Sequence, residues 1–289
     1  MPFNQNTFLR STAGSKGFSL VELLVTIGII AVLAGLTGGI YKKALSHAAM
    51  AQDIAAGKTL VAAYQSFAAE NNGDLMIGYL KGAAPVALPN GSQIGGEAAN
   101  RYMWRLAPYF DFRTDGVIYG KARQNAAKES ADAGESGYGQ SLSTSFGINA
   151  FYVGGYYEEA GKSTVPVGDV ASRLSQVKKP SSLLVFATAK NDEGPGYFLV
   201  KAPRFVPRAP GGPTLSQSDW PQNGTAASTG FVDARYNQKA LCAFLDGSIR
   251  SYKASELEDM RLWSVRAAEN DSAGYAPTLE GGSGGRGNR

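Results

Sequence analysis

An apolar run of 24 residues, from Phe18 to Tyr41, constrains the fold of this chain more than any other stretch. As a helix the run would be about 35 Å long, which is enough to cross the hydrocarbon core of a bilayer. One carboxylate, Glu22, lies inside it. Because a charged side chain costs several kcal/mol in lipid, we expect Glu22 to serve a function.

The residues around the run argue against a simple export signal. A secretory signal peptide has an apolar stretch of about 7–15 residues followed by a small-residue cleavage site. Here Arg10 and Lys16 precede a longer run, Gly17 marks the junction, and no such cleavage site follows. A plain membrane anchor would account for the length of the run, but it leaves Glu22 unexplained.

Residues 16–41 resemble the type IV prepilin family, which includes pilins and type II secretion pseudopilins. In that family a membrane-embedded peptidase cuts after the glycine of a G-F-x-x-x-E motif and methylates the new N-terminal phenylalanine. Gly17, Phe18 and Glu22 match this motif residue by residue. The resemblance implies that residues 1–17 are a cleaved leader. As partners it implies a prepilin peptidase, an assembly platform protein, an ATPase and further copies of the chain in a filament.

The chemistry of the cut chain gives Glu22 a role. The new α-amine of Phe18, with an unperturbed pKa of about 8, would be largely cationic at neutral pH, and N-methylation keeps the charge. In the family this amine is thought to pair with the corresponding acid of a neighbouring subunit, so assembly would relieve the cost of an unpaired acid. The alternative is local, because Ser19-x-x-Glu22 also fits a capping box at a helix start. Both interactions can hold at different stages.

Further along the apolar run, small residues recur every four positions, at Ala31, Gly35 and Gly39. Such a row lets helices approach closely, as helix packing in a filament core would require. The alternative is the ordinary glycine content of membrane helices.

Residues 42–73 continue the helix with an amphipathic pattern, since they contain no proline and much alanine. Residues spaced by three and four form a stripe that we expect to pack on a globular head: Ile54, Gly57, Val61, Tyr64 and Ala68. Four polar residues lie mainly off this stripe: Asp53, Lys58, Gln65 and Glu70. Asn71-Asn72-Gly73 supplies the stop.

Residues 74–280 are expected to form the head, giving an α+β, pilin-like fold in which a helix over about 18–70 packs by its second half on a mainly antiparallel sheet. Four apolar runs predict strands: Leu183–Ala189, Tyr197–Val200, Ala240–Leu245 and Ser248–Tyr252. Asp246-Gly247 predicts a type I′ hairpin turn between the last two. Short helices are predicted at Arg101–Leu106 and Ser255–Trp263, and a disordered, glycine-rich tail at 281–289.

The C-terminal block is similar to a planctomycete and verrucomicrobial group of prepilin-like proteins that carry H-x9-D-G near their ends. Here Tyr236, nine residues and Asp246-Gly247 fit that spacing, with tyrosine in place of histidine. This departure puts in doubt any role that the histidine has in that group.

Charge and cysteine content limit the possible partners. Without residues 1–17 the chain has 26 basic and 24 acidic residues, a net charge of +2, and no dense Lys/Arg block. Nucleic acid is therefore not an expected partner. Cys242 is the only cysteine, so no intrachain disulfide can form, and its place in an apolar strand predicts a buried, inert thiol.

Residues that could support catalysis or metal binding are few. His47 is the only histidine and lies on the long helix, so a His-based triad and a multi-His metal site are excluded and we do not expect an enzyme. The segment 161–164 resembles part of a phosphate loop but lacks the first glycine. Some major pseudopilins bind calcium in the head. Asp111, Asp115 and Asp192 are candidates for such a site, with solvated loop acids as the alternative.

The predicted function is that of a structural filament subunit. The chain would first sit in the inner membrane by a single pass, with its head in the periplasm, and then enter a periplasmic or cell-surface filament. The alternative is a ligand- or surface-binding head that uses the prepilin end only for export and anchoring. The loop 203–230 and the tyrosine-rich segment 151–157 would then carry binding, although core packing is another use for these aromatic rings.

Overall fold

A computed structural model describes residues 18–119, 133–159, 162–163, 169–203, 220 and 225–276. The chain divides into two compact units between His47 and Ala48, and each is described by itself. The predicted leader, the predicted tail and most of the loop 203–230 lie outside the described residues. The side chains at residues 34, 36–43, 133–136, 159 and 162–163 also lie outside them.

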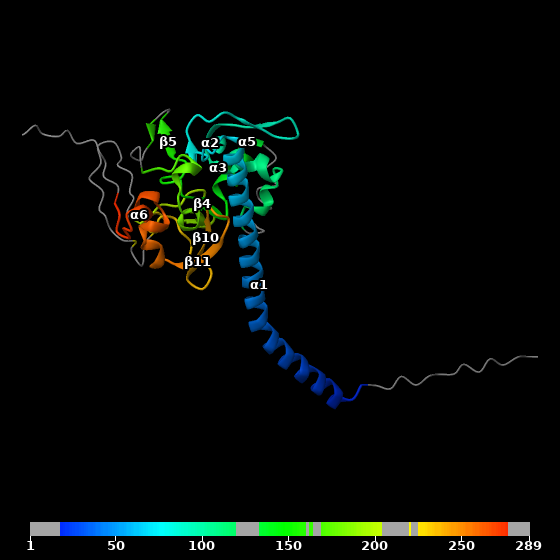
Figure 1. Ribbon diagram of the computed structural model, residues 1–289. Coiled ribbons are helices and arrows are strands. Elements are labelled where there is room, and N and C mark those ends of the chain that lie inside the picture. Colours follow the sequence, from blue (N-terminus) through cyan, green and yellow to red (C-terminus); the bar gives the residue numbers. More distant parts are fainter. Residues whose placement is uncertain are drawn as a thin grey trace, which may run out of the picture. The chain divides into compact units, whose positions relative to one another are not determined.

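Helix α1 runs from Leu20 to Glu70 and belongs partly to each unit (Figure 1). Its end confirms the predicted stop. Asn72 and Gly73 have positive φ angles of 53° and 84°, and the Gly73 N–H donates to the carbonyl of Ala68 at 2.8 Å. A left-handed residue after the last turn satisfies helix carbonyls that have no partner within the helix.

The predicted stripe forms the buried face of α1 in the head. Gly57, Val61, Tyr64 and Ala68 are buried, and Ile54 is partly buried. The Tyr64 hydroxyl donates to the carbonyl of Met76 at 3.0 Å, which satisfies its polar atom inside the core.

The head is built on a four-stranded antiparallel sheet with strand order β11-β10-β7-β4. These strands are β4 (Phe146–Ile148), β7 (Leu184–Thr188), β10 (Lys239–Phe244) and β11 (Ile249–Lys253). Figure 1 shows the head part of α1 on one side of this sheet and α6 (Val265–Glu269) on the other. Because both faces are covered, β7 is buried along its whole length.

Shorter elements complete the described part of the head. The strands are β1 (Tyr79–Leu80), β2 (Val86–Ala87), β3 (Gln93–Ile94), β5 (Tyr156–Glu159), β6 (Lys162–Ser163), β8 (Lys190–Asn191) and β9 (Gly194–Pro195). The helices are α2 (Gly96–Asn100), α3 (Tyr102–Leu106) and α5 (Ala133–Leu142). The 3-10 turns are η1 (Ala107–Phe110), η2 (Thr114–Gly116), η3 (Leu174–Gln176), η4 (Pro180–Ser182), η5 (Ala227–Thr229), η6 (Glu256–Glu258) and η7 (Met260–Leu262). Strand β1 pairs with β5 in parallel, whereas β5-β6, β2-β3 and β8-β9 are antiparallel. The fold is α+β, an N-terminal helix followed by mainly antiparallel sheets, as predicted.

The hairpin around Asp246-Gly247 is confirmed, but its predicted turn type is wrong. A type I′ turn needs positive φ at both central residues. Only Gly247 has one, at 87°. The Gly247 N–H donates to the carbonyl of Phe244, and the Phe244 N–H donates to the carbonyl of Ser248, both at 2.9 Å. The loop therefore has three residues and ends in a left-handed glycine.

Two other predicted elements are also corrected. Residues 197–200 form no strand but cross β4 at one parallel bridge, Ile148 to Leu199. Gly147 permits this crossing, because a Cβ there would lie 2.5 Å from the carbonyl carbon of Leu199.

The predicted helix Ser255–Trp263 is instead two 3-10 turns, η6 and η7. Asp259 interrupts them with a ψ of 105°, and its carboxylate accepts from the Arg261 N–H at 2.9 Å. Aspartate favours such a cap over a helix interior. The predicted helix Arg101–Leu106 is confirmed as α3.

Gly57 gives a direct test of how α1 packs on the sheet. A Cβ at this position would lie 2.8 Å from Cζ of Phe146 and 3.1 Å from Cδ1 of Ile249. We predict that Gly57→Leu lowers the free energy of unfolding by about 1–3 kcal/mol because it overpacks this contact. Ala55→Leu, on the exposed face, is the control and should leave the unfolding midpoint nearly unchanged. Equal midpoints for the two variants would contradict the packing.

Candidate functional site

The start of α1 holds the side chains that the prepilin motif singles out. Phe18 and Ser19 lie just before the helix. The Ser19 N–H donates to Oε2 of Glu22 at 2.9 Å, and the Val21 N–H donates to Oγ of Ser19 at 3.3 Å. These bonds form the local capping box. In the single chain Glu22 is thus bound to its own backbone, and its pairing with a neighbour's Phe18 amine stays a prediction. Gly17 lies outside the described residues.

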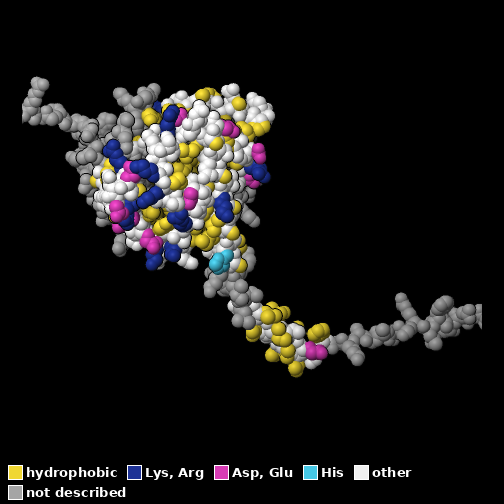
Figure 2. Space-filling view, in the orientation of Figure 1, with side chains coloured by type: hydrophobic (Ala, Val, Ile, Leu, Met, Phe, Trp, Pro, Cys, Tyr) yellow, Lys and Arg dark blue, Asp and Glu magenta, His cyan; other side chains and the backbone are white. Residues whose placement is uncertain are grey.

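Large apolar side chains cover the described part of the N-terminal half-helix (Figure 2). From Phe18 to Leu33 their exposed fractions lie between 52% and 77%. Burying one such side chain fully is worth about 1.5–3 kcal/mol, so this surface favours a covering of lipid or protein.

The search for a membrane span gives a separate result. None of the helices in the described part of the chain combines the length and the hydropathy that crossing a bilayer requires. The single membrane pass over residues 18–41 stays a prediction.

The space around the small-residue row is empty at the positions whose side chains are described. Ala31 is exposed, and no heavy atom lies within 4 Å of the position that a Cβ would take at Gly28 or Gly35. The surroundings of Gly39 lie outside the described side chains. Both explanations of the row therefore stay open.

A buried charged cluster, which the sequence analysis did not predict, joins α1 to the C-terminal part of the head. Asp53 is only 4% exposed. Its Oδ2 accepts from Nη2 and Nε of Arg235 at 2.9 and 3.1 Å, and from the Tyr236 hydroxyl at 2.6 Å. The same hydroxyl lies 3.1 Å from the carbonyl of Ala49, and Asp233 binds Arg235 at 2.8 Å. We call Asp53, Asp233, Arg235 and Tyr236 the Arg235 cluster.

The guanidinium of Arg235 is well satisfied despite its burial. It also donates to the carbonyls of Ser145 and Ala189, at 2.9 and 3.3 Å, and lies 4.2 Å from the centre of the Tyr119 ring. Burial lowers the pKa of Arg235, but the Asp53 and Asp233 carboxylates outweigh it and raise the pKa overall. A buried charge with this many partners fixes one arrangement of the surrounding chain.

The prediction that Asp53 lies off the packed stripe is therefore wrong, because Asp53 is buried against the head. A signal was present, because Asp53 precedes Gly57 by four residues, a spacing that places both on one face of the helix. Tyr236, noted only as a departure from a histidine, is 8% exposed and links the C-terminal block to α1. The Tyr236 hydroxyl binds Asp53, and nothing in the spacing of the sequence pairs these two residues.

The other predicted site residues are dispersed. Cys242 is fully buried, and burial raises the pKa of its thiol, as expected of an inert cysteine. Asp111, Asp115 and Asp192 are exposed. Within the described residues, no three His, Cys, Asp or Glu side chains form a group that could hold a metal ion.

The tyrosine-rich segment 151–157 is used largely for packing. Phe151 is 1% exposed and Tyr152 is fully buried. The ring of Tyr156 stacks between those of Phe151 and Tyr79, at centroid distances of 4.9 and 4.7 Å. The phosphate-loop segment contributes Lys162 and Ser163 to strand β6, and its other residues lie outside the described chain.

Comparison with known proteins supports the prepilin resemblance at the N-terminus. A model of the prokaryotic N-terminal methylation motif matches residues 12–38, a span that contains Gly17, Phe18 and Glu22. No curated protein and no solved structure matches the chain. The chain therefore has a prepilin-like N-terminal segment, of the kind that prepilin peptidase processes, which fits membrane anchoring followed by filament assembly.

The Arg235 cluster predicts a large effect of a small change. Asp53→Asn keeps the shape but leaves Arg235 with one carboxylate, so we expect a loss of about 3 kcal/mol in the free energy of unfolding. The control is Asp74→Asn, which removes an exposed ion pair with Arg173, at 2.7 Å, and should cost less than about 1 kcal/mol. Denaturant unfolding of both variants measures the difference, and similar losses would argue against a structural role for the cluster.

Tyr236→Phe should cost about 1 kcal/mol, with a pH dependence of defined sign. Burial, and then the hydrogen bond to Asp53, raise the pKa of Tyr236 above its usual value of 10.0. A raised pKa stabilises the fold below the unfolded pKa, and this contribution is lost as pH rises through the folded pKa. The stability gap between wild type and Tyr236→Phe should therefore be constant below about pH 9 and shrink above about pH 10. A gap that widens in alkali would contradict the assignment.

Proposed function

We propose that the chain is a structural subunit of a type IV pilin-like or type II secretion pseudopilus filament. The observation that carries the proposal is the methylation motif over residues 12–38. The exposed apolar half-helix supports it, because a helix with this surface needs lipid before assembly and protein after it.

The proposed sequence of events begins in the inner membrane. Residues 18–41 hold the chain there by a single pass, with the head in the periplasm. Prepilin peptidase cuts between Gly17 and Phe18 and methylates the amine of Phe18. An assembly platform protein, driven by an ATPase, then moves the subunit into a filament of identical chains in the periplasm or on the cell surface.

The proposed assembly contact joins the Phe18 amine of one copy to Glu22 of another. A carboxylate has about four lone-pair sites, so the capping bond from Ser19 leaves room for an ammonium group. Close approach of the half-helices would use the row Ala31, Gly35 and Gly39. The chain needs no catalytic group and no cofactor for this role, and we propose none.

Processing gives the first test. When the full chain is expressed with a matching prepilin peptidase, the mature protein should begin at Phe18 and carry one added methyl group. Mass spectrometry of the N-terminal peptide measures this. A chain that stays uncut, or is cut at another bond, would refute the proposal.

Glu22 gives the second test, because charge and capping can be separated. Glu22→Gln removes the charge but keeps a side chain that fits a capping box, whereas Glu22→Ala removes both. Both variants should be cleaved normally and fail to enter filaments. Ser19→Ala is the control, because it loses the bond to the Val21 N–H, at a cost of about 1 kcal/mol in helix stability, and should still assemble. Normal filaments from Glu22→Gln would show that capping, and not charge, is what matters.

A further inference from the structure

A small pocket lies between η4 and α6. Helix α6 lies on the side of the head away from α1 (Figure 1). We call this pocket the Lys179 pocket. Its volume is about 200 Å³. Four apolar side chains form its floor: Val177, Leu183, Val265 and Ala268. The space suits a ligand of about one amino-acid residue with an apolar side chain.

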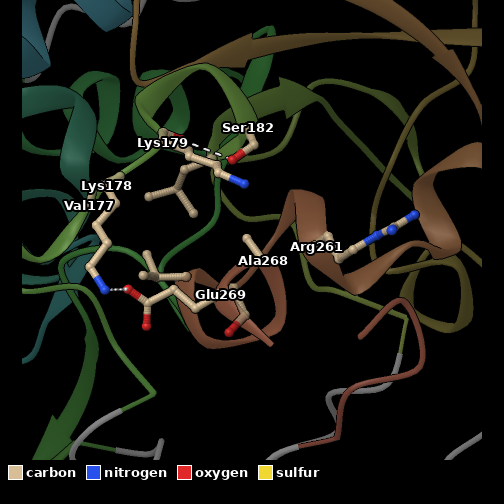
Figure 3. A pocket seen from close by; sticks show the side chains of 10 residues that line it. Val177, Lys178, Lys179, Ser182, Arg261, Ala268 and Glu269 are labelled. Atoms are coloured by element: carbon tan, nitrogen blue, oxygen red, sulfur yellow. Dashed lines mark hydrogen bonds and ion pairs between the residues drawn. The ribbon is translucent and has the colours of Figure 1, made fainter. Parts of the chain in front are cut away.

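Two of the three cations around the pocket are already neutralised. Nζ of Lys178 lies 2.9 Å from Oε1 of Glu269. The guanidinium of Arg261 lies 2.6 Å from carboxylate oxygens of both Asp259 and Asp271. Figure 3 shows the Lys178–Glu269 pair at one edge of the pocket and the Arg261 guanidinium directed away from it.

Lys179 differs from these two cations. Among the described residues no carboxylate lies within ion-pair distance of its amine. Lys179 and Ser182 both line the pocket, and Figure 3 shows them at the edge opposite the Lys178–Glu269 pair. The Ser182 hydroxyl donates its proton to the Lys179 carbonyl, with an oxygen–oxygen distance of 2.9 Å. The lone pairs of Oγ can therefore still accept a hydrogen bond from a ligand. This edge therefore offers one cationic donor and one neutral acceptor above an apolar floor.

We propose that the Lys179 pocket binds the carboxyl-terminal residue of a peptide chain with an aliphatic last side chain. The terminal carboxylate pairs with Lys179, the amide N–H of the same residue donates to Oγ of Ser182, and the side chain covers the floor. The three groups of such a residue match the three features of the pocket in charge and polarity. A filament assembled through α1 would leave this side of the head accessible, but the site does not depend on the filament role.

The probe is N-acetyl-leucine, and the full chain in detergent is titrated by saturation-transfer NMR. A ligand of about twelve non-hydrogen atoms should bind with millimolar affinity. N-acetyl-leucine amide, which has no charge, should bind about two- to fivefold more weakly, as expected for a solvent-exposed ion pair. Equal affinity for acid and amide overturns the proposal. Equal or tighter binding of 4-methylpentanoate, which lacks the N–H, would identify the ligand as a free short-chain acid and also overturns it.

Substitutions in the pocket test whether the probe binds there. Lys179→Gln changes an exposed side chain and should bring the affinities for acid and amide together. Lys81→Gln, another exposed lysine, is the matched control and should leave their ratio unchanged. Ala268→Leu fills the floor and should abolish binding of both probes, with near-UV circular dichroism as the check on folding. An acid preference that survives Lys179→Gln places the site elsewhere and overturns the assignment.

Discussion

The Arg235 cluster is the interaction on which the arrangement of the head depends. One buried guanidinium binds Asp53 on α1, Asp233 beside the central sheet and two backbone carbonyls. Burying any one of these charged groups alone would cost free energy, but here each charge has an ion-pair or hydrogen-bond partner. The cluster lies near the point where the chain divides into its two units, so it fixes the helix at the beginning of its packed half. Gly57 and Tyr64 continue the same face by apolar packing.

The N-terminal half of α1 is subject to the opposite constraint. Its large apolar side chains from Phe18 to Leu33 are more than half exposed, and its one acid is held by a local cap. In this one helix the second half packs on the head, whereas the apolar surface of the first half requires lipid or protein to cover it.

Sequence predicted those features that depend on local pattern. The prepilin motif, the buried stripe from Ile54 to Ala68, the helix stop and strands β7, β10 and β11 all follow from spacing and turn residues. Features that depend on distant partners were missed. The burial of Asp53 was missed because its partners lie about 180 residues away in the sequence. The segment 197–200 crosses β4 only because Gly147 has no side chain to block its backbone. The turn at Asp246-Gly247 was placed correctly, but its type depends on a hydrogen bond between Phe244 and Ser248 that the dipeptide does not encode.

A helical reconstruction of filaments that contain this chain tests the central claim most directly. The account predicts that the half-helices form the filament interior, with the Phe18 amine of each copy within about 4 Å of the Glu22 carboxylate of a neighbour. Half-helices on the outside of the filament, or a Glu22 that contacts only its own Ser19, would contradict it.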